Sequence, residues 1–330
     1  MSEKTAELIH TDDQFAQPEP SKGEKVKRFL YSQRGWLWIL PAFILLCVFT
    51  FWPIVNTLVS SFRNNYRGLT GLSDGVGIEN FKTALQDAYF LTCLRNTVVF
   101  TFISVPLSTI LALLISVGLA SIKWLQKAYQ SIFFLPYLTN ALSIGAVFAA
   151  MFKVIGTDAQ IIAGKGTWGL INNIFGSHIH WVDTNAKTIA MMAVIIIYEI
   201  WSGLPFKILI LFGALQNVNK QYYDAAKIDG ANKATTLWRI TVPLISPMIS
   251  YLLITGFIGG FKSYTAIVGI FGPKMGPMNN YEMGTIVGLI YRYIDNGQTG
   301  VACAASLVLF AMIMVFTIIN LWLSKKRVHY

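Results

Sequence analysis

Two stretches of the sequence place chemically useful residues at positions that share one face of a helix. Residues at i, i+3, i+4 and i+7 lie on the same side of an α-helix. One stretch supplies a carboxylate, a hydroxyl, a small gap and an aromatic ring, and the other supplies three glycines and a hydroxyl. An aromatic ring can take the apolar face of a pyranose while polar groups take its hydroxyls, so these faces suit a sugar. They consist of Glu199, Ser202, Gly203 and Phe206, and of Gly256, Gly259, Gly260 and Ser263.

Each face also has a purely structural interpretation. Glycines at helical spacing are typical of close packing between helices in a membrane, which explains the second face without a ligand. Glu199 could equally make a hydrogen bond or an ion pair to a neighbouring helix. Both interpretations stay open from these residues alone. Pro205, inside the first face, is expected to kink its helix.

Motifs for catalysis and for nucleotide hydrolysis are missing. A phosphate-binding loop needs G-x-x-x-x-G-K-[ST], and the two glycines around Lys165 do not fit that pattern. The three cysteines show no C-x-x-C spacing, so neither a zinc site nor a disulfide framework is indicated. His178 and His180 are close together, but a metal site there is a remote alternative. We therefore expect no catalytic residue, no metal and no cofactor on this chain.

The elements that must position the two faces are membrane helices. Of the 330 residues, 54% are hydrophobic and only 13% are charged, whereas a soluble domain has about 25% charged residues. Four charge-free runs, and two apolar segments with one or two charges, exceed the ~20 residues that cross a hydrocarbon core. The composition therefore indicates an all-α integral membrane protein with six transmembrane helices. The predicted spans cover about 36–62, 96–122, 128–152, 188–215, 243–271 and 301–324.

Lysine and arginine predict which helix ends face the cytoplasm. Cytoplasmic segments of membrane proteins carry an excess of these residues, and 15 of the 26 fall on the side of the N-terminus. Both termini are therefore predicted to be cytoplasmic. The net charge of +10 marks topology and does not indicate a nucleic-acid partner. The segments on this side are 1–35, 122–128, 215–242 and the basic C-terminus 325–330. Segment 1–35 is a polar tail, and its end is either an interfacial helix or a basic stop before the first span.

The predicted spans hold few ionisable residues. Glu199, Lys207 and Lys262 are the clear cases. A carrier driven by protons or sodium usually places several such groups in its spans as a relay. We therefore expect the energy for this membrane pathway to come from another polypeptide.

The predicted cytoplasmic segment 215–242 reads as a helix, a turn and a second helix. Asn219, or a residue just after it, can cap the first helix. Gly230 can supply the positive φ that ends it, and the second helix then runs toward Pro243. The paired alanines Ala225 and Ala226 would let another protein approach the first helix closely.

This segment resembles the coupling motif of permease subunits of bacterial ABC importers. The order Asp-Ala-Ala-x-x-Asp-Gly-Ala from Asp224 to Ala231, followed by Thr-x-Pro-Leu, is most similar to the carbohydrate branch, the relatives of the maltose transporter's membrane subunits. The similarity covers nearly all of 36–324. Further matches are Leu40-Pro41, Trp52-Pro53, Arg95-Asn96-Thr97, Phe133-Phe134-Leu135-Pro136, Trp201-x-Gly203-Leu204-Pro205-Phe206 and Gly260-Phe261-Lys262.

The resemblance implies the type I ABC importer permease fold and assigns roles to both sites. The coupling segment would dock into a cleft on a cytoplasmic ATPase, through Tyr223, Asp224, Ala225, Ala226, Asp229, Gly230 and Ala231. The family usually has Glu at the position of Asp224. In the maltose relative, the residues aligned with Ser202, Gly203, Phe206, Gly256, Gly259, Gly260 and Ser263 line the sugar site. That relative has an aromatic residue and an amide at Gly259 and Gly260, so the site here is expected to be wider.

The resemblance thus implies a multi-pass permease subunit of the bacterial cytoplasmic membrane, importing a carbohydrate such as an oligosaccharide. Its partners would be a second permease, two ATPase subunits that bind ATP and magnesium, and an extracytoplasmic binding protein. Two alternatives remain: the same architecture importing a glycerol-phosphate, and a self-sufficient secondary carrier. On the outer side, 78–90 is predicted to form an amphipathic helix. This helix and the loops 153–187 and 272–300 are equal candidates for contact with the binding protein.

Overall fold

The structure is a computed structural model, and it describes residues 38–122, 126–156, 167–277 and 280–327, with Gly23, Trp36 and Gln160. The predicted tail 1–35 lies outside the described residues except for Gly23. The chain divides into two compact units, Met1–Thr57 and Leu58–Tyr330. The regular secondary structure of the described part is helical, with two isolated bridges, Arg63 with Val76 and Ile155 with Thr167.

Four helices are long and apolar enough to cross a membrane. The first covers Trp38–Ser61 and includes η2 (Cys47–Phe51) and α2 (Trp52–Ser61). The others lie in the second unit and are α4 (Phe90–Ser121), α9 (Thr188–Gln216) and α16 (Thr299–Arg327). Two further bent pairs of helices pass the same test, so the described residues hold four candidate spans, or up to six.

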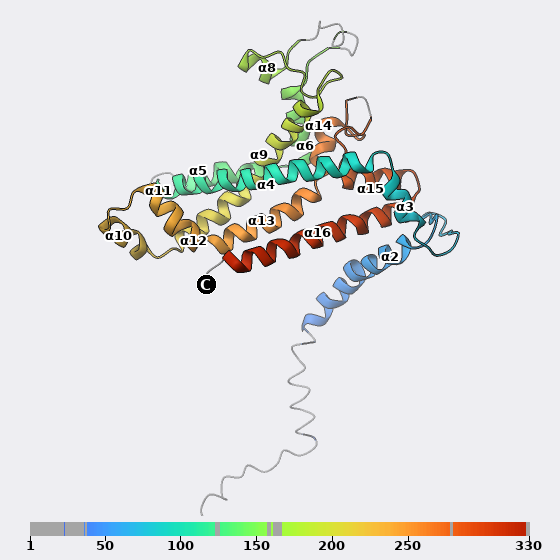
Figure 1. The fold of residues 1–330 in the computed structure, drawn as a ribbon, viewed down its shortest axis with the longest axis horizontal. Coiled ribbons are helices and arrows are strands. Elements are labelled where there is room, and N and C mark those ends of the chain that lie inside the picture. Colours follow the sequence, from blue (N-terminus) through green and yellow to red (C-terminus); the bar gives the residue numbers. More distant parts are fainter. Residues whose placement is uncertain are drawn as a thin grey trace, which may run out of the picture. The chain divides into compact units, whose positions relative to one another are not determined.

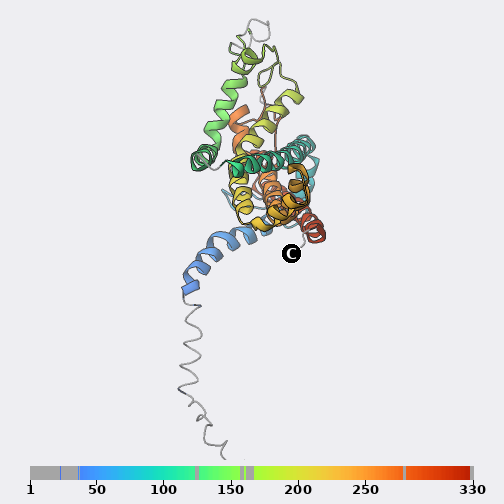
Figure 2. The ribbon, with the colours of Figure 1, turned by 90° about the vertical axis from the view of Figure 1, so that its left-hand side faces the viewer.

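The shorter helices of the second unit connect and flank these long ones. They are α3 (Glu79–Gln86), α5 (Gln126–Phe134), η3 (Leu135–Leu138), α6 (Ala141–Phe152), α8 (Leu170–Phe175), α10 (Lys220–Ile228), α11 (Lys233–Thr236), η4 (Leu237–Thr241), α12 (Val242–Leu244), α13 (Ser246–Phe261), α14 (Thr265–Phe271) and α15 (Ile286–Asp295). Within this unit α4, α13 and α16 run side by side, and α6, α8 and α14 lie together beyond them (Figures 1 and 2).

The predicted span 128–152 is sharply bent. Ser131–Leu138 and Ala141–Phe152 meet at 102°. Pro136 lacks the N–H that would continue a helix, and the side chain of Asn140 caps α6 by accepting from the backbone N–H of Leu142 at 2.9 Å. The bend is therefore built into the local sequence.

The predicted span 243–271 is broken twice. Lys233–Leu244 and Ser246–Phe261 are bent by 71° around Ile245. After Phe261 the chain leaves the helix for three residues before α14 begins at Thr265. Two consecutive glycines before this second break weaken the helix there. The break turns α14 toward α6, where Gly145 and Gly269 approach so closely that a Cβ on Gly145 would lie 2.9 Å from the Gly269 Cα.

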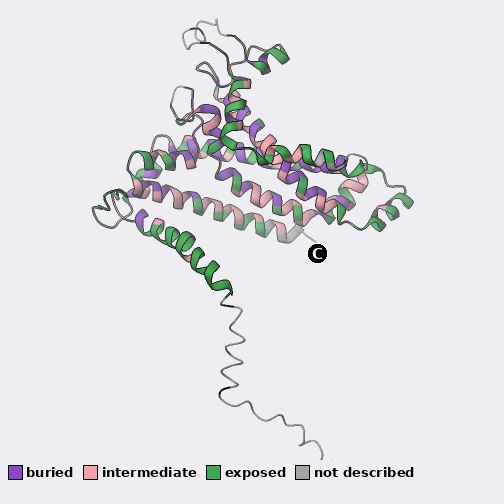
Figure 3. Ribbon diagram, turned by 180° about the vertical axis from the view of Figure 1, so that it is seen from behind, coloured by how far each residue is buried: buried purple, intermediate pink, exposed green. Residues whose placement is uncertain are grey.

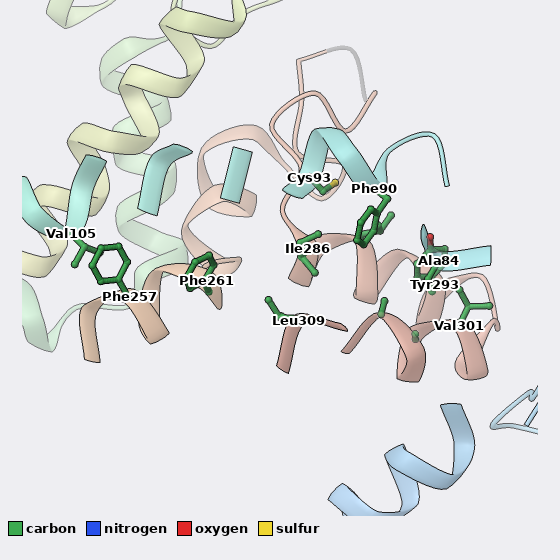
Figure 4. Close-up of a cluster of buried hydrophobic side chains, with 13 residues drawn as sticks. Ala84, Phe90, Cys93, Val105, Phe257, Phe261, Ile286, Tyr293, Val301 and Leu309 are labelled. Carbon is green, nitrogen blue, oxygen red and sulfur yellow. The ribbon is translucent and has the colours of Figure 1, made fainter. Parts of the chain in front are cut away.

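Three clusters of buried apolar side chains hold the second unit together. One joins α3, α4, α13, α15 and α16 and includes Ala84, Phe257 and Leu309 (Figure 4). Buried and exposed residues alternate along α4, α9 and α16 because one face of each packs inward, whereas Trp38–Ser61 is almost wholly exposed (Figure 3). The predicted amphipathic helix is present but shorter than 78–90, because Asp87 ends α3 and accepts from the backbone N–H of Tyr89 at 2.8 Å.

Candidate functional site

Glu199 on α9 and Ser263 after α13 meet in the structure, although 64 residues separate them. The Ser263 hydroxyl donates a hydrogen bond to Glu199 Oε1, and both residues are half-buried. The two faces that the sequence spacing singled out therefore touch at this point. Glu199 has the contact to a neighbouring element that its structural interpretation requires, and it stays partly accessible.

Lys207, eight positions after Glu199 on α9, reaches in a different direction. Its ammonium donates to the backbone oxygen of Val105 at 3.1 Å and to Ser108 Oγ at 2.5 Å, both on α4. Lys207 is only 7% exposed. A charge inside a predicted span is costly unless it is hydrogen-bonded, so these contacts make Lys207 a cross-link between α9 and α4.

The glycine face of α13 is divided between packing and open space. A Cβ on Gly256 would lie 2.8 Å from Val105 Cγ1, and one on Gly260 would lie 2.6 Å from Thr101 Cγ2. These two positions accept only glycine at the observed distance to α4. Gly259 is exposed, and a Cβ there would meet nothing within 4 Å. The packing interpretation therefore describes Gly256 and Gly260, and the accessible position is Gly259.

The remaining predicted residues of α9 lie between these contacts. Ser202, Gly203 and Phe206 are half-buried. A Cβ on Gly203 would stand 3.8 Å from Ser108 Oγ, so this position has more room than Gly256. The Phe206 ring stacks on Tyr137 of η3, with centroids 5.9 Å apart and planes 19° apart.

Tyr137 is a candidate that the sequence spacing missed. It is 52% exposed and lies in the bend between α5 and α6. Irregular backbone at membrane depth is tolerated where it is buried in protein or lines a cavity. The signal for it was Pro136 inside an apolar run, which predicts a break in the helix. A separate apolar hollow, lined by Phe133, Phe134, Pro205, Ile208, Leu209 and Phe212, contains none of the predicted site residues.

Substitutions at Ser108 and Lys207 are expected to lower stability by different amounts. Ser108→Ala leaves the buried ammonium one acceptor short, so we expect it to lower the free energy of unfolding by about 1–3 kcal/mol. Lys207→Met should cost less, because Val105 O still accepts from Ser108 and Thr109 and no buried charge remains. Thermal unfolding of both variants in detergent measures this order. Unchanged thermal stability in both variants would show that the cross-link does not hold α9 to α4.

The segment between α9 and α13 has the helix, turn and helix that the sequence predicted. Asn219 caps α10 by accepting from the Gln221 N–H at 3.0 Å. Gly230 has φ +70°, and the backbone N–H of Ala231 closes the turn on the Ala226 oxygen at 2.9 Å. A second cap at Asn232, which accepts from the Thr235 N–H at 2.7 Å, starts α11.

The candidate coupling residues divide into an inner and an outer set. Ala226 is buried, and Tyr223 is held to η4 by a hydrogen bond from Thr241 Oγ1 at 3.3 Å. Asp224, Ala225, Asp229 and Gly230 are exposed, and Ala231 is half-buried. Ile228 on the same helix is 87% exposed and adds an apolar side chain to this outer set. The outer set is presented by a short, capped helix.

No group of three or more metal-ligating side chains lies together among the described residues. His180 Nδ1 pairs with Asp183 at 2.7 Å, while the His178 ring packs on Trp168. The predicted site residues offer hydrogen bonds and aromatic faces, an arrangement that suits reversible binding of a polar molecule.

Comparison with known proteins identifies related sequences along most of the chain. The family model described as binding-protein-dependent transport system inner membrane component matches residues 104–329. The arabinooligosaccharides transport system permease protein of Bacillus subtilis is 29% identical over 93% of this chain and 94% of its own length. The sn-glycerol-3-phosphate transport system permease protein of Agrobacterium fabrum is 27% identical over 89% of this chain and 96% of its own length.

Among solved structures, a chain of a bacterial alginate ABC transporter, crystallised with an alginate pentasaccharide-bound periplasmic protein, has a similar fold. The TM-score is 0.72 over 92% of this chain and 96% of that chain, at 20% sequence identity. At this identity the likeness establishes the fold alone, which this chain shares with that chain of an ABC transporter.

Proposed function

This chain belongs to the family of binding-protein-dependent transport system inner membrane components, among its carbohydrate ABC importer permeases, and from that premise we propose that it forms half of the pathway of an ATP-driven oligosaccharide importer. It is a multi-pass protein of the cytoplasmic membrane. The observation that carries the proposal is the meeting of two polar faces at Glu199 and Ser263, beside the open position Gly259.

The proposed topology has six spans and both termini in the cytoplasm. The four long helices and the two bent pairs supply the spans. The excess of lysine and arginine on one side sets the orientation. Segment 215–242, with α10 and α11, then lies in the cytoplasm, and α3 and α15 lie on the outer side.

The proposed sugar contacts combine hydrogen-bonding groups with aromatic faces. Glu199 and Ser263 offer a carboxylate and a hydroxyl, and Ser202 offers a second hydroxyl. Phe206 and Tyr137 form a stacked pair that can take the apolar face of a pyranose. Gly203 and Gly259 leave room beside them. Gly256 and Gly260 act by letting α13 approach α4.

The charges of this pathway favour a neutral sugar over a phosphorylated solute. A phosphate would need accessible cations, but the Lys207 ammonium is buried and already donates to Val105 and Ser108. Lys262 is exposed, but the Glu199 carboxylate is in contact with Ser263 next to it. An acidic side chain at this point does not supply the cation that a phosphate would need.

The proposed coupling runs through α10. The exposed set Asp224, Ala225 and Asp229 would dock into a cleft on a cytoplasmic ATPase subunit, where ATP and magnesium bind. Closure of two such ATPase subunits would move α10 and, through α11 to α13, tilt the spans. A second permease completes the pathway, and an extracytoplasmic binding protein delivers the sugar. This chain supplies the contacts and no catalytic group.

Reconstitution of the complete assembly tests the proposal. The permease, its co-encoded second permease, ATPase and binding protein are placed in proteoliposomes, and uptake of labelled lactose, raffinose, arabinotriose and glycerol 3-phosphate is measured. We expect uptake of at least one of the three sugars that requires both ATP and the binding protein. Uptake of glycerol 3-phosphate alone would favour the other importer class. Uptake by this chain alone along an ion gradient would favour a secondary carrier.

A further inference from the structure

Tyr264 and Tyr291 form a tight aromatic pair that none of the roles above uses. Their rings are stacked, with centroids 4.4 Å apart and planes 16° apart. Tyr264 lies directly after Ser263, in the break between α13 and α14, and Tyr291 lies on α15. The pair therefore brings α15 to the point where Ser263 meets Glu199.

The exposure of Tyr291 separates it from the packing residues of its helix. Leu289 and Tyr293, on either side, are 0% and 2% exposed and belong to the buried cluster. Figure 4 labels Tyr293 within this cluster. Tyr291 is 46% exposed. An aromatic residue that served only packing would turn inward like Tyr293, because burial of its ring stabilises the fold.

The surroundings of Tyr291 have the chemistry of a sugar subsite. Tyr264 stacks on Tyr291, so the orientation of the Tyr291 ring is fixed before a sugar binds. Asp295 follows at i+4 on the same face of α15, is exposed, and has a carboxylate that can accept from sugar hydroxyls. The chain at Lys262–Tyr264 leaves the helix within a predicted span, and such interruptions mark substrate sites in membrane transporters.

We propose that Tyr291, backed by Tyr264 and with Asp295 beside it, is an outer stacking subsite that receives a pyranose or furanose ring before the sugar reaches Glu199 and Ser263. This inference rests on the proposed import of an oligosaccharide. An oligosaccharide offers several rings, so one ring can occupy this subsite while another reaches the inner contacts. Tyr291 then selects for sugars over acyclic solutes of similar polarity.

The test uses the complete assembly in proteoliposomes with its loaded binding protein, and lactose, raffinose and arabinotriose as probes. We expect Tyr291→Leu to lower the kcat/KM of uptake about three- to tenfold, the range typical of a lost aromatic contact. Tyr291→Phe keeps the ring and should retain at least half of wild-type uptake. Ile294→Ala, which trims an equally exposed side chain on the same helix, is the matched control and should be unchanged.

Two further measurements keep the result decisive. Thermal unfolding and ATP hydrolysis stimulated by the loaded binding protein should match wild type in Tyr291→Leu. If that variant does not assemble, Tyr291→Met replaces it, because a thioether still packs on Tyr264 but offers no ring face. Wild-type uptake in Tyr291→Leu, or an equal loss in Tyr291→Phe, overturns the subsite while sugar import stands. Absence of sugar uptake in the wild-type assembly overturns both.

Discussion

Combining Asp224→Lys with Ala225→Trp is expected to lower ATP-driven uptake about tenfold or more. Both side chains are exposed on α10, the helix proposed to enter the cleft of the ATPase. The first change reverses the charge that orients the contact, and the second adds a large ring where a methyl group allowed close approach. Losses of this size are typical when the centre of an interface is disrupted.

The fold should survive this double substitution, because neither side chain is buried. Asp224 contacts Lys227 at 3.3 Å, and such an exposed pair contributes little to stability. Ala234→Trp on α11 adds the same bulk at an exposed position outside the proposed contact and serves as the control. Uptake and ATP hydrolysis are measured together in proteoliposomes. Equal uptake by the double variant and Ala234→Trp would remove α10 from the coupling pathway.

The helices on either side of Gly230 could be predicted because their signals are local. Asn219 and Gly230 act on backbone groups within a few residues, so the sequence alone specifies where α10 begins and ends. Long apolar runs likewise predict helices that can cross a membrane. Their orientation rests on the distribution of lysine and arginine and stays a prediction.

The contacts of the pathway could not be predicted in the same way. The spacing of Gly256, Gly259 and Gly260 puts all three within one broad stripe of a helix, but their directions differ by up to 100° or so. Which of them faces α4 depends on the rotation of α13, and that rotation is set by packing across the whole helix. The hydrogen bond between Glu199 and Ser263 joins two distant segments, so no local pattern reports it.

The sequence contains a signal for the bend at Tyr137, but the length of the apolar run indicates only a span. A charge-free run predicted one span over 128–152. Pro136 and the cap at Asn140 instead bend it and expose Tyr137 beside Phe206. A proline within an apolar run therefore indicates irregular backbone at a site, even where the run is long enough for a straight helix.

Opposite effects are expected from the same substitution at two adjacent glycines. Gly260→Ala would put a methyl group 2.6 Å from Thr101 Cγ2 and 2.9 Å from its Oγ1, so it should lower the free energy of unfolding by about 1–3 kcal/mol. Gly259→Ala meets nothing within 4 Å and replaces glycine inside a helix, so it should raise stability by up to about 1 kcal/mol. Thermal unfolding in detergent compares the two.

Thr101→Ala supplies the rescue for Gly260→Ala. It removes the two closest atoms and leaves Cβ at 3.2 Å, and the buried Thr101 hydroxyl has no hydrogen-bond partner to lose. The double variant should therefore recover most of the lost stability, giving a coupling energy of about 1 kcal/mol or more between the two sites. Additive losses would place the strain elsewhere than between α13 and α4.

Gly259→Phe tests the pathway without disturbing the packing of α13 on α4, because the new ring would enter the open space beside Gly259. We expect it to keep wild-type stability while lowering uptake of arabinotriose and raffinose more strongly than uptake of lactose, since longer sugars need more of that space. A matched loss for all three sugars would point to a general block instead of a size filter. Unchanged uptake of all three would take Gly259 out of the pathway. Stability thus reports on Gly260, which faces α4, and transport reports on the adjacent Gly259, which faces away from α4.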